Sequence, residues 1–127
     1  MTDVTGFALL GHLLEICRGS QLQAQIEFER VPFIDIALHL AQAGFATGAA
    51  DRNWASYAES VVLEGDLAEW QRKLLCDPQT SGGLLISCAP ESVNEVLDFF
   101  NSDGFNDAAI IGFMHKGSVQ VTVRLGL

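Results

Sequence analysis

Residues 76–86 are the stretch of this chain best suited to hold an anionic ligand. They read Cys-Asp-Pro-Gln-Thr-Ser-Gly-Gly-Leu-Leu-Ile. Thr80 and Ser81 offer hydroxyl groups, while Gly82 and Gly83 can adopt positive φ and admit a ligand or another backbone close to the main chain. Backbone N–H groups in such a loop can bind an oxyanion. A tight helix-to-strand connection without a ligand would use the same residue types, so both interpretations remain open.

Asp3 is the carboxylate best placed to bind a metal ion. It lies beside Thr2 and Thr5, directly before an apolar helical pattern. As an N-cap it would accept hydrogen bonds from the first turn of that helix. As a metal ligand it would lie near phosphate groups, because a helix N-terminus attracts anions. One carboxylate does not complete a Mg²⁺ site, which draws on one or two carboxylates, water and substrate phosphate.

No catalytic constellation can be argued from the remaining polar residues. The chain lacks a GxxxxGK[ST] phosphate loop and a dinucleotide-binding fingerprint. His12 lies inside the apolar helical pattern, and we expect a core or interface histidine rather than a base. The three cysteines have no metal-binding spacing, and we expect buried free thiols in a reducing cytosol at Cys17, Cys76 and Cys88. The sequence therefore predicts no catalytic residue in this chain.

The composition indicates one domain of 127 residues with an acidic surface. The formal net charge is −9, from 16 acidic and 7 basic residues, and no basic stripe is present. Such a chain is a poor candidate for binding nucleic acid or an anionic membrane. An anionic ligand would therefore be held by backbone dipoles, metal ions or a second polypeptide.

The hydrophobic content bears on partners and on location. Hydrophobic residues make up 49% of the chain, which is high for a small monomer, so we expect a partner or another domain to cover part of the surface. The sequence has no signal peptide and no apolar run of about 18 residues. We therefore expect a soluble, cytoplasmic protein.

The hydrophobic pattern predicts an α+β domain with helices packed on a mostly antiparallel sheet. Apolar spacing predicts helices at residues 7–17, 34–41, 66–75 and 90–104. Alternating or continuous apolar residues predict strands at 21–29, 57–63, 84–88, 108–114 and 119–125, with a turn at 115–117 joining the last two. Residues 44–55 show no periodicity, and we expect a flexible loop there.

Three stretches of the chain together resemble the selenide, water dikinase (selenophosphate synthetase) family. Residues 2–12, TDVTGFALLGH, resemble that family's TDVTGFGLLGH segment, and residues 75–85, LCDPQTSGGLL, resemble its LxDPQTSGGLL segment. Arg52 and Asn53, which lie between them, match a weaker third feature. The resemblance covers essentially the whole chain but only the C-terminal half of the family's protein. It implies that residues 1–127 form one domain of a longer enzyme.

The resemblance also implies a fold and a reaction. The expected fold is the three-layer α/β/α arrangement, partly ferredoxin-like, that aminoimidazole ribonucleotide synthetase has in its C-terminal domain. The expected reaction converts selenide, ATP and water to selenophosphate, AMP and phosphate with Mg²⁺. The family's reactive Cys or selenocysteine, its partner Lys and its ATP-binding domain are N-terminal, so the 127-residue chain alone is expected to be inactive. The full-length protein is expected to be a homodimer.

The resemblance carries roles over to particular residues. Asp3 matches the family's one metal-binding Asp in this half. We expect the two motif loops to help close the Mg²⁺–ATP site through Thr5, Gly6, Thr80, Ser81, Gly82 and Gly83. Cys76 does not correspond to the family's reactive residue. Ala8 replaces the usual second glycine of the first segment, and we expect helix packing to tolerate this change.

Two alternatives to this function remain at the level of sequence. The chain could be the C-terminal domain of a related ATP-dependent enzyme of the hydrogenase maturation or thiamine-monophosphate kinase type. The motif at residues 77–83 favours the selenium enzyme over these relatives. It could also be a stand-alone binding domain, since it lacks a nucleophile, a Lys clamp and sufficient carboxylates.

Overall fold

The computed structural model describes residues 1–126, which form five α-helices and six strands. The helices are α1 (Ala8–Ser20), α2 (Asp35–Gln42), α3 (Gly48–Tyr57), α4 (Glu69–Leu75) and α5 (Val93–Ser102). The strands are β1 (Thr2–Asp3), β2 (Gln23–Glu27), β3 (Val61–Leu63), β4 (Leu84–Leu85), β5 (Gly112–His115) and β6 (Val121–Arg124). Short 3₁₀ turns span Phe28–Arg30, Ala58–Ser60 and Pro90–Ser92.

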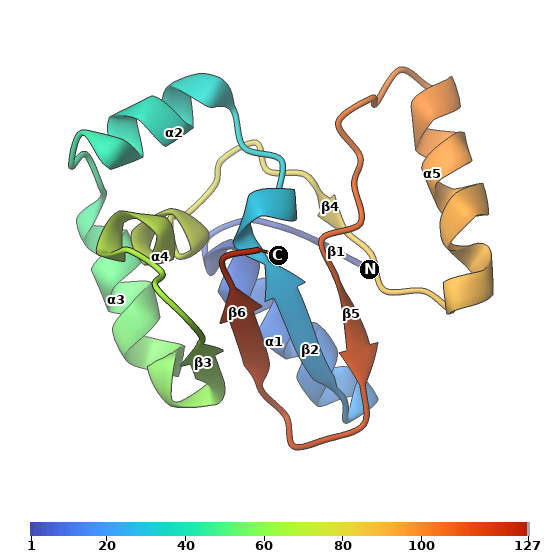
Figure 1. Ribbon diagram of the computed structural model, residues 1–127, viewed down its shortest axis with the longest axis horizontal. Helices are drawn as coiled ribbons and strands as arrows, with labels where there is room; N and C mark the ends of the chain where they lie inside the picture. The colour runs from blue at the N-terminus through green and yellow to red at the C-terminus, as the bar shows by residue number, and fades with distance from the viewer. Residues whose placement is uncertain (127) are drawn as a thin grey trace.

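The main sheet has four strands in the order β3-β6-β2-β5, and β1 pairs with β4 in a separate two-stranded sheet (Figure 1). Strand β6 runs parallel to both β2 and β3, whereas β5 runs antiparallel to β2. The predicted α+β class is confirmed. The expectation of a mostly antiparallel sheet is wrong, because two of the three pairings in the main sheet are parallel. The three-layer arrangement stays a prediction.

Strands β5 and β6 do not form the hairpin that the turn at residues 115–117 suggested. Each pairs with a different edge of β2, so β2 is central and the connection between β5 and β6 passes around its end (Figure 1). The N–H of Ala24 donates to the carbonyl of Gln120 at 3.0 Å, which extends the parallel pairing into this connection. The turn residues therefore allowed a change of direction without determining which strands became neighbours.

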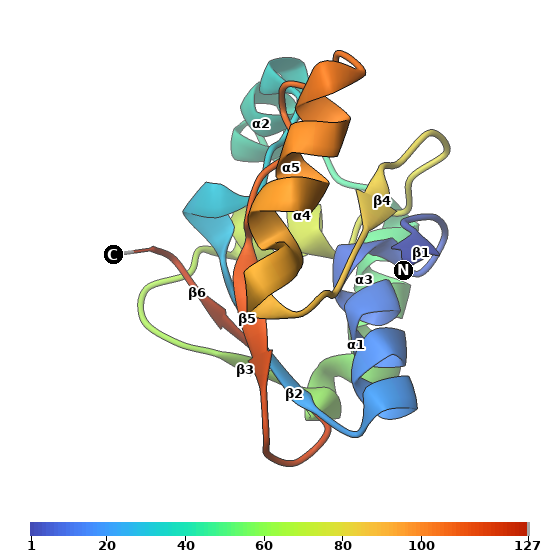
Figure 2. The same ribbon diagram turned by 90° about the vertical axis from the view of Figure 1, so that its right-hand side faces the viewer.

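The core lies between the main sheet and helix α1, which covers one face of the sheet together with α3 (Figure 2). Alternate residues of each strand point to the same face of the sheet, and these side chains form the sheet's contribution to the core. The shared buried cluster includes Leu10, Leu14 and Cys17 of α1, Ala24 and Ile26 of β2, and Val121 and Val123 of β6. This packing fixes α1, and with it the segment that precedes α1.

Helix α3 occupies a segment for which the sequence pattern predicted a flexible loop, so that prediction is wrong. The side chain of Thr47 caps the helix by accepting a hydrogen bond from the N–H of Ala50 at 3.2 Å. Only Ala50 and Tyr57 of this helix are buried, so the segment shows little apolar periodicity. The alanines of the segment favour a helix by intrinsic propensity.

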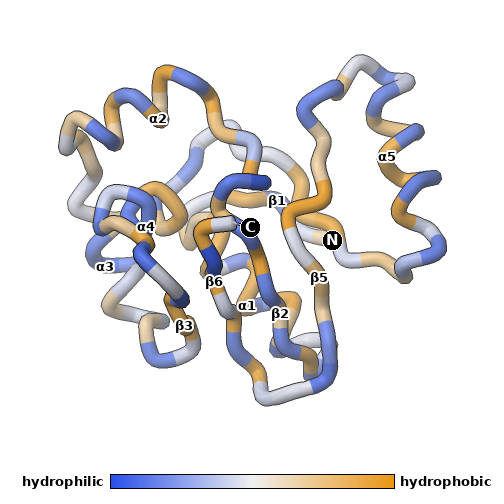
Figure 3. Tube along the Cα trace, in the orientation of Figure 1, coloured by the Kyte–Doolittle hydropathy of each residue, from blue (hydrophilic) through white to orange (hydrophobic). Residues whose placement is uncertain are grey.

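The strands that flank α5 are shorter than predicted. Strand β4 ends at Leu85, because its partner β1 has only two residues, and Cys88 is exposed rather than buried. The thiols of Cys17 and Cys76 are buried as expected. Helix α5 begins after Pro90 as predicted, but it buries none of its residues, and hydrophobic residues recur along it (Figure 3). Within residues 1–126 no helix is long and apolar enough to cross a membrane.

Candidate functional site

The two motif segments, residues 2–6 and 79–85, lie side by side although they are far apart in sequence (Figures 1 and 2). Strands β1 and β4 pair in antiparallel register, with Asp3 opposite Leu84. Beyond the strands, the N–H of Val4 donates to the carbonyl of Gly83 at 2.9 Å, and the N–H of Gln79 donates to the carbonyl of Thr5 at 3.1 Å. Main-chain hydrogen bonds thus join both loops into one surface.

Most of the candidate ligand-binding residues are exposed on this surface. They are Asp3, Thr5, Gly6, Thr80, Ser81 and Gly83, while Gly82 is half-buried. The hydroxyls of Thr80 and Ser81 make no hydrogen bond to another group of residues 1–126, so they can donate to an incoming ligand. The resemblance implied that both loops contribute to one site, and the fold places them in direct contact.

Gly82 is required by close packing rather than by backbone conformation. Neither Gly82 nor Gly83 has a positive φ, so the conformational reason considered for them does not apply. A Cβ at Gly82 would overlap the carbonyl oxygen of Val4 and lie 2.5 Å from Oε1 of Gln79. A Cβ at Gly83 would meet no atom within 4 Å. Only the first glycine is needed for the contact between the loops.

Asp3 lies in β1 and does not cap helix α1, so the N-cap interpretation is wrong. Phe7 occupies the N-cap position, and no side chain caps the helix. The Asp3 carboxylate is exposed and forms no hydrogen bond or ion pair within the part of the chain that the structure describes. It therefore offers a free oxygen ligand of the type Mg²⁺ prefers. Among positions 1–126, no group of three His, Cys, Asp or Glu residues gathers in a way that could hold a metal ion.

His12 is buried, as expected, and lies against the first motif loop. Its Nε2 is 3.1 Å from Oγ1 of Thr5, and its Nδ1 is 3.4 Å from Oε2 of Glu15. The hydrogen bond limits rotation of the Thr5 hydroxyl. His12 therefore orients a candidate ligand-binding group, a role that the sequence alone did not suggest.

Cys76 precedes the second motif but is unsuited to nucleophilic chemistry. The Cys76 side chain is fully buried. Burial raises the pKa of the Cys76 thiol, which keeps the thiol neutral, and the thiolate is the reactive form. The pKa of the Tyr57 hydroxyl is also raised. Burial is the larger cause, and the neighbouring Cys76 thiol is the second. A neutral, buried thiol therefore makes Cys76 a poor nucleophile.

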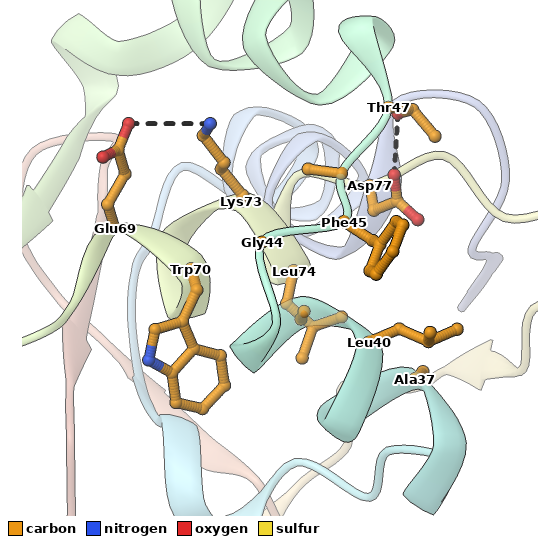
Figure 4. A pocket seen from close by; sticks show the side chains of 12 residues that line it. Ala37, Leu40, Gly44, Phe45, Thr47, Glu69, Trp70, Lys73, Leu74 and Asp77 are labelled. Carbon is orange, nitrogen blue, oxygen red and sulfur yellow. Dashed lines mark hydrogen bonds and ion pairs between the residues drawn. The ribbon is translucent and has the colours of Figure 1, made fainter.

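A hollow of about 450 Å³ lies between α2 and α4 and reaches the second motif only through Asp77 (Figure 4). Its walls are mainly apolar, with Leu40, Phe45 and Leu74 among the lining side chains. Thr47 closes one end by donating its hydroxyl to Oδ1 of Asp77 at 2.7 Å. Because Asp77 is already engaged, the exposed groups of the two loops remain the better candidates for binding a phosphate.

Ala8, in the first motif, has a strained backbone conformation. It is fully buried at the start of α1 with φ +64, a region that costs an L-residue about 1–2 kcal/mol. We expect Ala8→Gly to raise the free energy of unfolding by up to about 1 kcal/mol, since glycine's larger unfolded-state entropy offsets part of the relief. Chemical denaturation of the 127-residue chain measures this change.

A matched control for Ala8→Gly is Ala55→Gly, at an exposed position of α3 with ordinary helical geometry. That change should lower the free energy of unfolding by about 1 kcal/mol. If both substitutions destabilise the chain equally, Ala8 is not strained.

The chain is similar to known proteins over nearly its whole length. The family model described as AIR synthase related protein, C-terminal domain, matches residues 1–124. The proteins named "Selenide, water dikinase" from Paraburkholderia xenovorans and Rhizobium meliloti are each 50% identical over 123 residues, which is 97% of this chain and 35% of each relative. The protein of that name from Pseudomonas straminea is 51% identical over 123 residues, 34% of its length. The chain thus spans about a third of these relatives.

Proposed function

Because the chain belongs to the AIR synthase-related family of C-terminal domains, we propose that it is the C-terminal domain of an ATP-dependent selenophosphate synthetase. The enzyme would convert selenide, ATP and water to selenophosphate, AMP and phosphate. The observation that carries the proposal is the contact between the two motif loops, in a chain 50% identical to proteins named "Selenide, water dikinase". The loops form one exposed surface with hydroxyls and a free carboxylate.

Each exposed group on this surface has a part in closing the Mg²⁺–ATP site. The hydroxyls of Thr80 and Ser81 donate to phosphate oxygens, and Thr5 presents its hydroxyl in an orientation limited by His12. Gly6 and Gly83, where an added Cβ would meet no atom within 4 Å, leave the main chain open to a phosphate group, and Gly82 allows the two loops to approach each other. Asp3 supplies one oxygen ligand for Mg²⁺. The bound ion would neutralise charge on the transferred phosphate.

The charge of the chain indicates why this surface needs a second polypeptide. The net charge is −9, and neither motif segment contains Lys or Arg. Phosphoryl transfer depends on positive charge positioned around the phosphates. The remaining cations, nucleophile and metal ligands would come from an N-terminal domain of the same protein. The full-length protein would form a homodimer.

The apolar surface around α5 is where we place contact with that N-terminal domain. Phe99 and Phe105 are 69% and 62% exposed, and both rings pack edge-on against Phe100. Exposed aromatic clusters of this kind mark interaction surfaces. In the 127-residue chain the cluster should bind an apolar dye and promote self-association. A chain that stays monomeric at high concentration without binding dye would count against this placement.

Selenide-dependent AMP formation tests the proposed function. The full-length protein should form AMP from ATP only when selenide is present, and the purified 127-residue chain should form none. Thiamine monophosphate serves as the control substrate for the related kinase. Turnover of that substrate, or no selenide dependence in the full-length protein, would reject the selenophosphate synthetase assignment. AMP formation by the 127-residue chain would reject the proposal that the nucleophile and the remaining cations lie in an N-terminal domain.

A stand-alone binding domain is the alternative that the coding sequence upstream of Met1 can exclude. A selenophosphate synthetase requires a glycine-rich segment with Cys or selenocysteine and Lys there, followed by segments that contain Asp. An upstream sequence without these residues would favour a binding domain.

A further inference from the structure

Asn53 connects the two motif loops through a single side-chain amide. Its Nδ2 donates one hydrogen bond to the carbonyl of Gly6 at 2.9 Å and another to the carbonyl of Cys76 at 3.0 Å. Each amide N–H thus has a separate acceptor: Gly6, the last residue of the first motif segment, and Cys76, which lies three residues before the second segment. Both acceptors are carbonyl oxygens, which fixes the assignment of the amide nitrogen.

We propose that Asn53 is a positioning residue that sets the distance between the two loops across the ligand-binding surface. The proposal deepens the proposed function and rests on it. Gly6 follows the candidate groups Asp3 and Thr5, while Cys76 precedes those at positions 80–83. The main-chain bonds between the loops join them on one side, and Asn53 joins them from helix α3. Both loops are therefore held at two points.

Helix α3 is suited to this role because other side chains anchor it to the same loops. Tyr57 donates its hydroxyl to the carbonyl of Phe7 at 2.9 Å, and Thr47 donates to Asp77 at 2.7 Å. Helix α1 approaches α3 closely, since a Cβ at Gly11 would lie 2.9 Å from Cε2 of Tyr57. A site held by a rigid helix keeps its geometry better than one held by loops alone.

The loss of Asn53 should change ligand geometry more than it changes the fold. Misplacing a reacting group by about 1 Å can reduce a rate by roughly 100-fold. The main-chain bonds between the loops remain after substitution, so we expect a smaller displacement and about a tenfold fall in kcat/KM for ATP. Asn53→Asp should have at least the same effect, because it keeps the side-chain shape but replaces the donor amide with acceptor oxygens.

Two measurements test the proposal on Asn53→Ala, Asn53→Asp and the control Ser56→Ala. Ser56 is exposed on α3, and its hydroxyl bonds only within the helix, to the carbonyl of Asn53. Hydrogen exchange is measured on the 127-residue chain, and steady-state kinetics on the full-length protein well below its unfolding temperature. Both Asn53 variants should exchange faster at residues 4–8 and 76–83, with no change in β2 and β6. Ser56→Ala should match the unsubstituted protein in both measurements.

The outcomes separate this proposal from the proposed function. Unchanged exchange in both loops, or unchanged kcat/KM in the Asn53 variants, would overturn the positioning role. Equally faster exchange throughout the chain would also overturn it, since that result indicates a purely structural residue. If the unsubstituted full-length protein forms no AMP with selenide, the proposed function fails. The exchange measurement then still decides whether Asn53 holds the loops.

Discussion

Gly82→Ala should destabilise the chain by about 1–3 kcal/mol, the usual cost of an added methyl group in a fully packed site. The new Cβ would overlap the carbonyl oxygen of Val4, a backbone atom of the first motif loop. Relief requires the two loops to separate, because the N–H of Val4 is held by the carbonyl of Gly83. Chemical denaturation of the 127-residue chain measures the loss.

Gly83→Ala is the matched control for this substitution. It lies next to Gly82, has an ordinary φ, and its added Cβ would meet nothing within 4 Å. We expect it to change the free energy of unfolding by no more than about 0.5 kcal/mol. In the full-length protein, Gly82→Ala should reduce turnover by more than the loss of folded protein explains. Equal stability losses for the two alanine variants would contradict the close approach at Gly82.

Asp3→Asn should lower the apparent affinity of the full-length protein for Mg²⁺ while leaving its fold intact. The change removes a negative charge but keeps the shape of the side chain. Removing a group that only supports a metal ligand lowers metal affinity by about 10- to 100-fold. Because Asp3 would be a ligand itself, we expect its loss to lower Mg²⁺ affinity by at least about tenfold. Because the carboxylate is exposed and does not cap α1, stability should change by less than about 0.5 kcal/mol. Initial rates across a Mg²⁺ titration measure the shift.

Asp107→Asn removes an equal charge from an exposed position outside both motif loops. It should leave the Mg²⁺ dependence unchanged, which separates a ligand effect from a change in net charge. If Asp3→Asn instead loses several kcal/mol of stability and keeps its Mg²⁺ dependence, Asp3 has a structural role.

Local signals predicted the elements whose own residues carry a strong apolar or proline signal. Apolar residues predicted helix α1, whose residues 8–14 are all buried. Alternation predicted β2, whose Ala24 and Ile26 point into the core. Pro90 marked the start of the segment that contains α5. In each case, a residue's own neighbours determine the structure.

The remaining elements depend on contacts that are distant in sequence. Alternation specifies which face of a strand is buried but not which strand pairs with it, so the positions of β5 and β6 on either side of β2 could not be predicted. The N-cap interpretation of Asp3 failed because the pairing of Asp3 opposite Leu84, which lies far along the chain, cannot be read from the residues around Asp3. Helix α3 buries only Ala50 and Tyr57 in the core and makes polar contacts with the loops, so its sequence shows no clear apolar period.

In the candidate site, too, some features could be predicted from local sequence and others depended on contacts between distant residues. Each motif loop was recognised from its own residues, including Thr5, Gly6 and positions 80–83. Their contact, and the part that Asn53 takes in it, required the fold. At the level of sequence, Asn53 matches only a weak feature of the family, in a segment expected to be a flexible loop. A Thr before a Gly-Ala-Ala-Asp sequence is the helix-start signal that could have identified α3.

The central claim is that residues 2–8 and 77–83 form one surface that closes on Mg²⁺–ATP. Amide hydrogen exchange of the full-length protein, with and without saturating Mg²⁺–ATP, tests this claim most directly. Exchange should slow in both segments together, while the amides of α5 should not be protected by the nucleotide. Unchanged exchange in both segments at a nucleotide concentration that saturates turnover would contradict the claim.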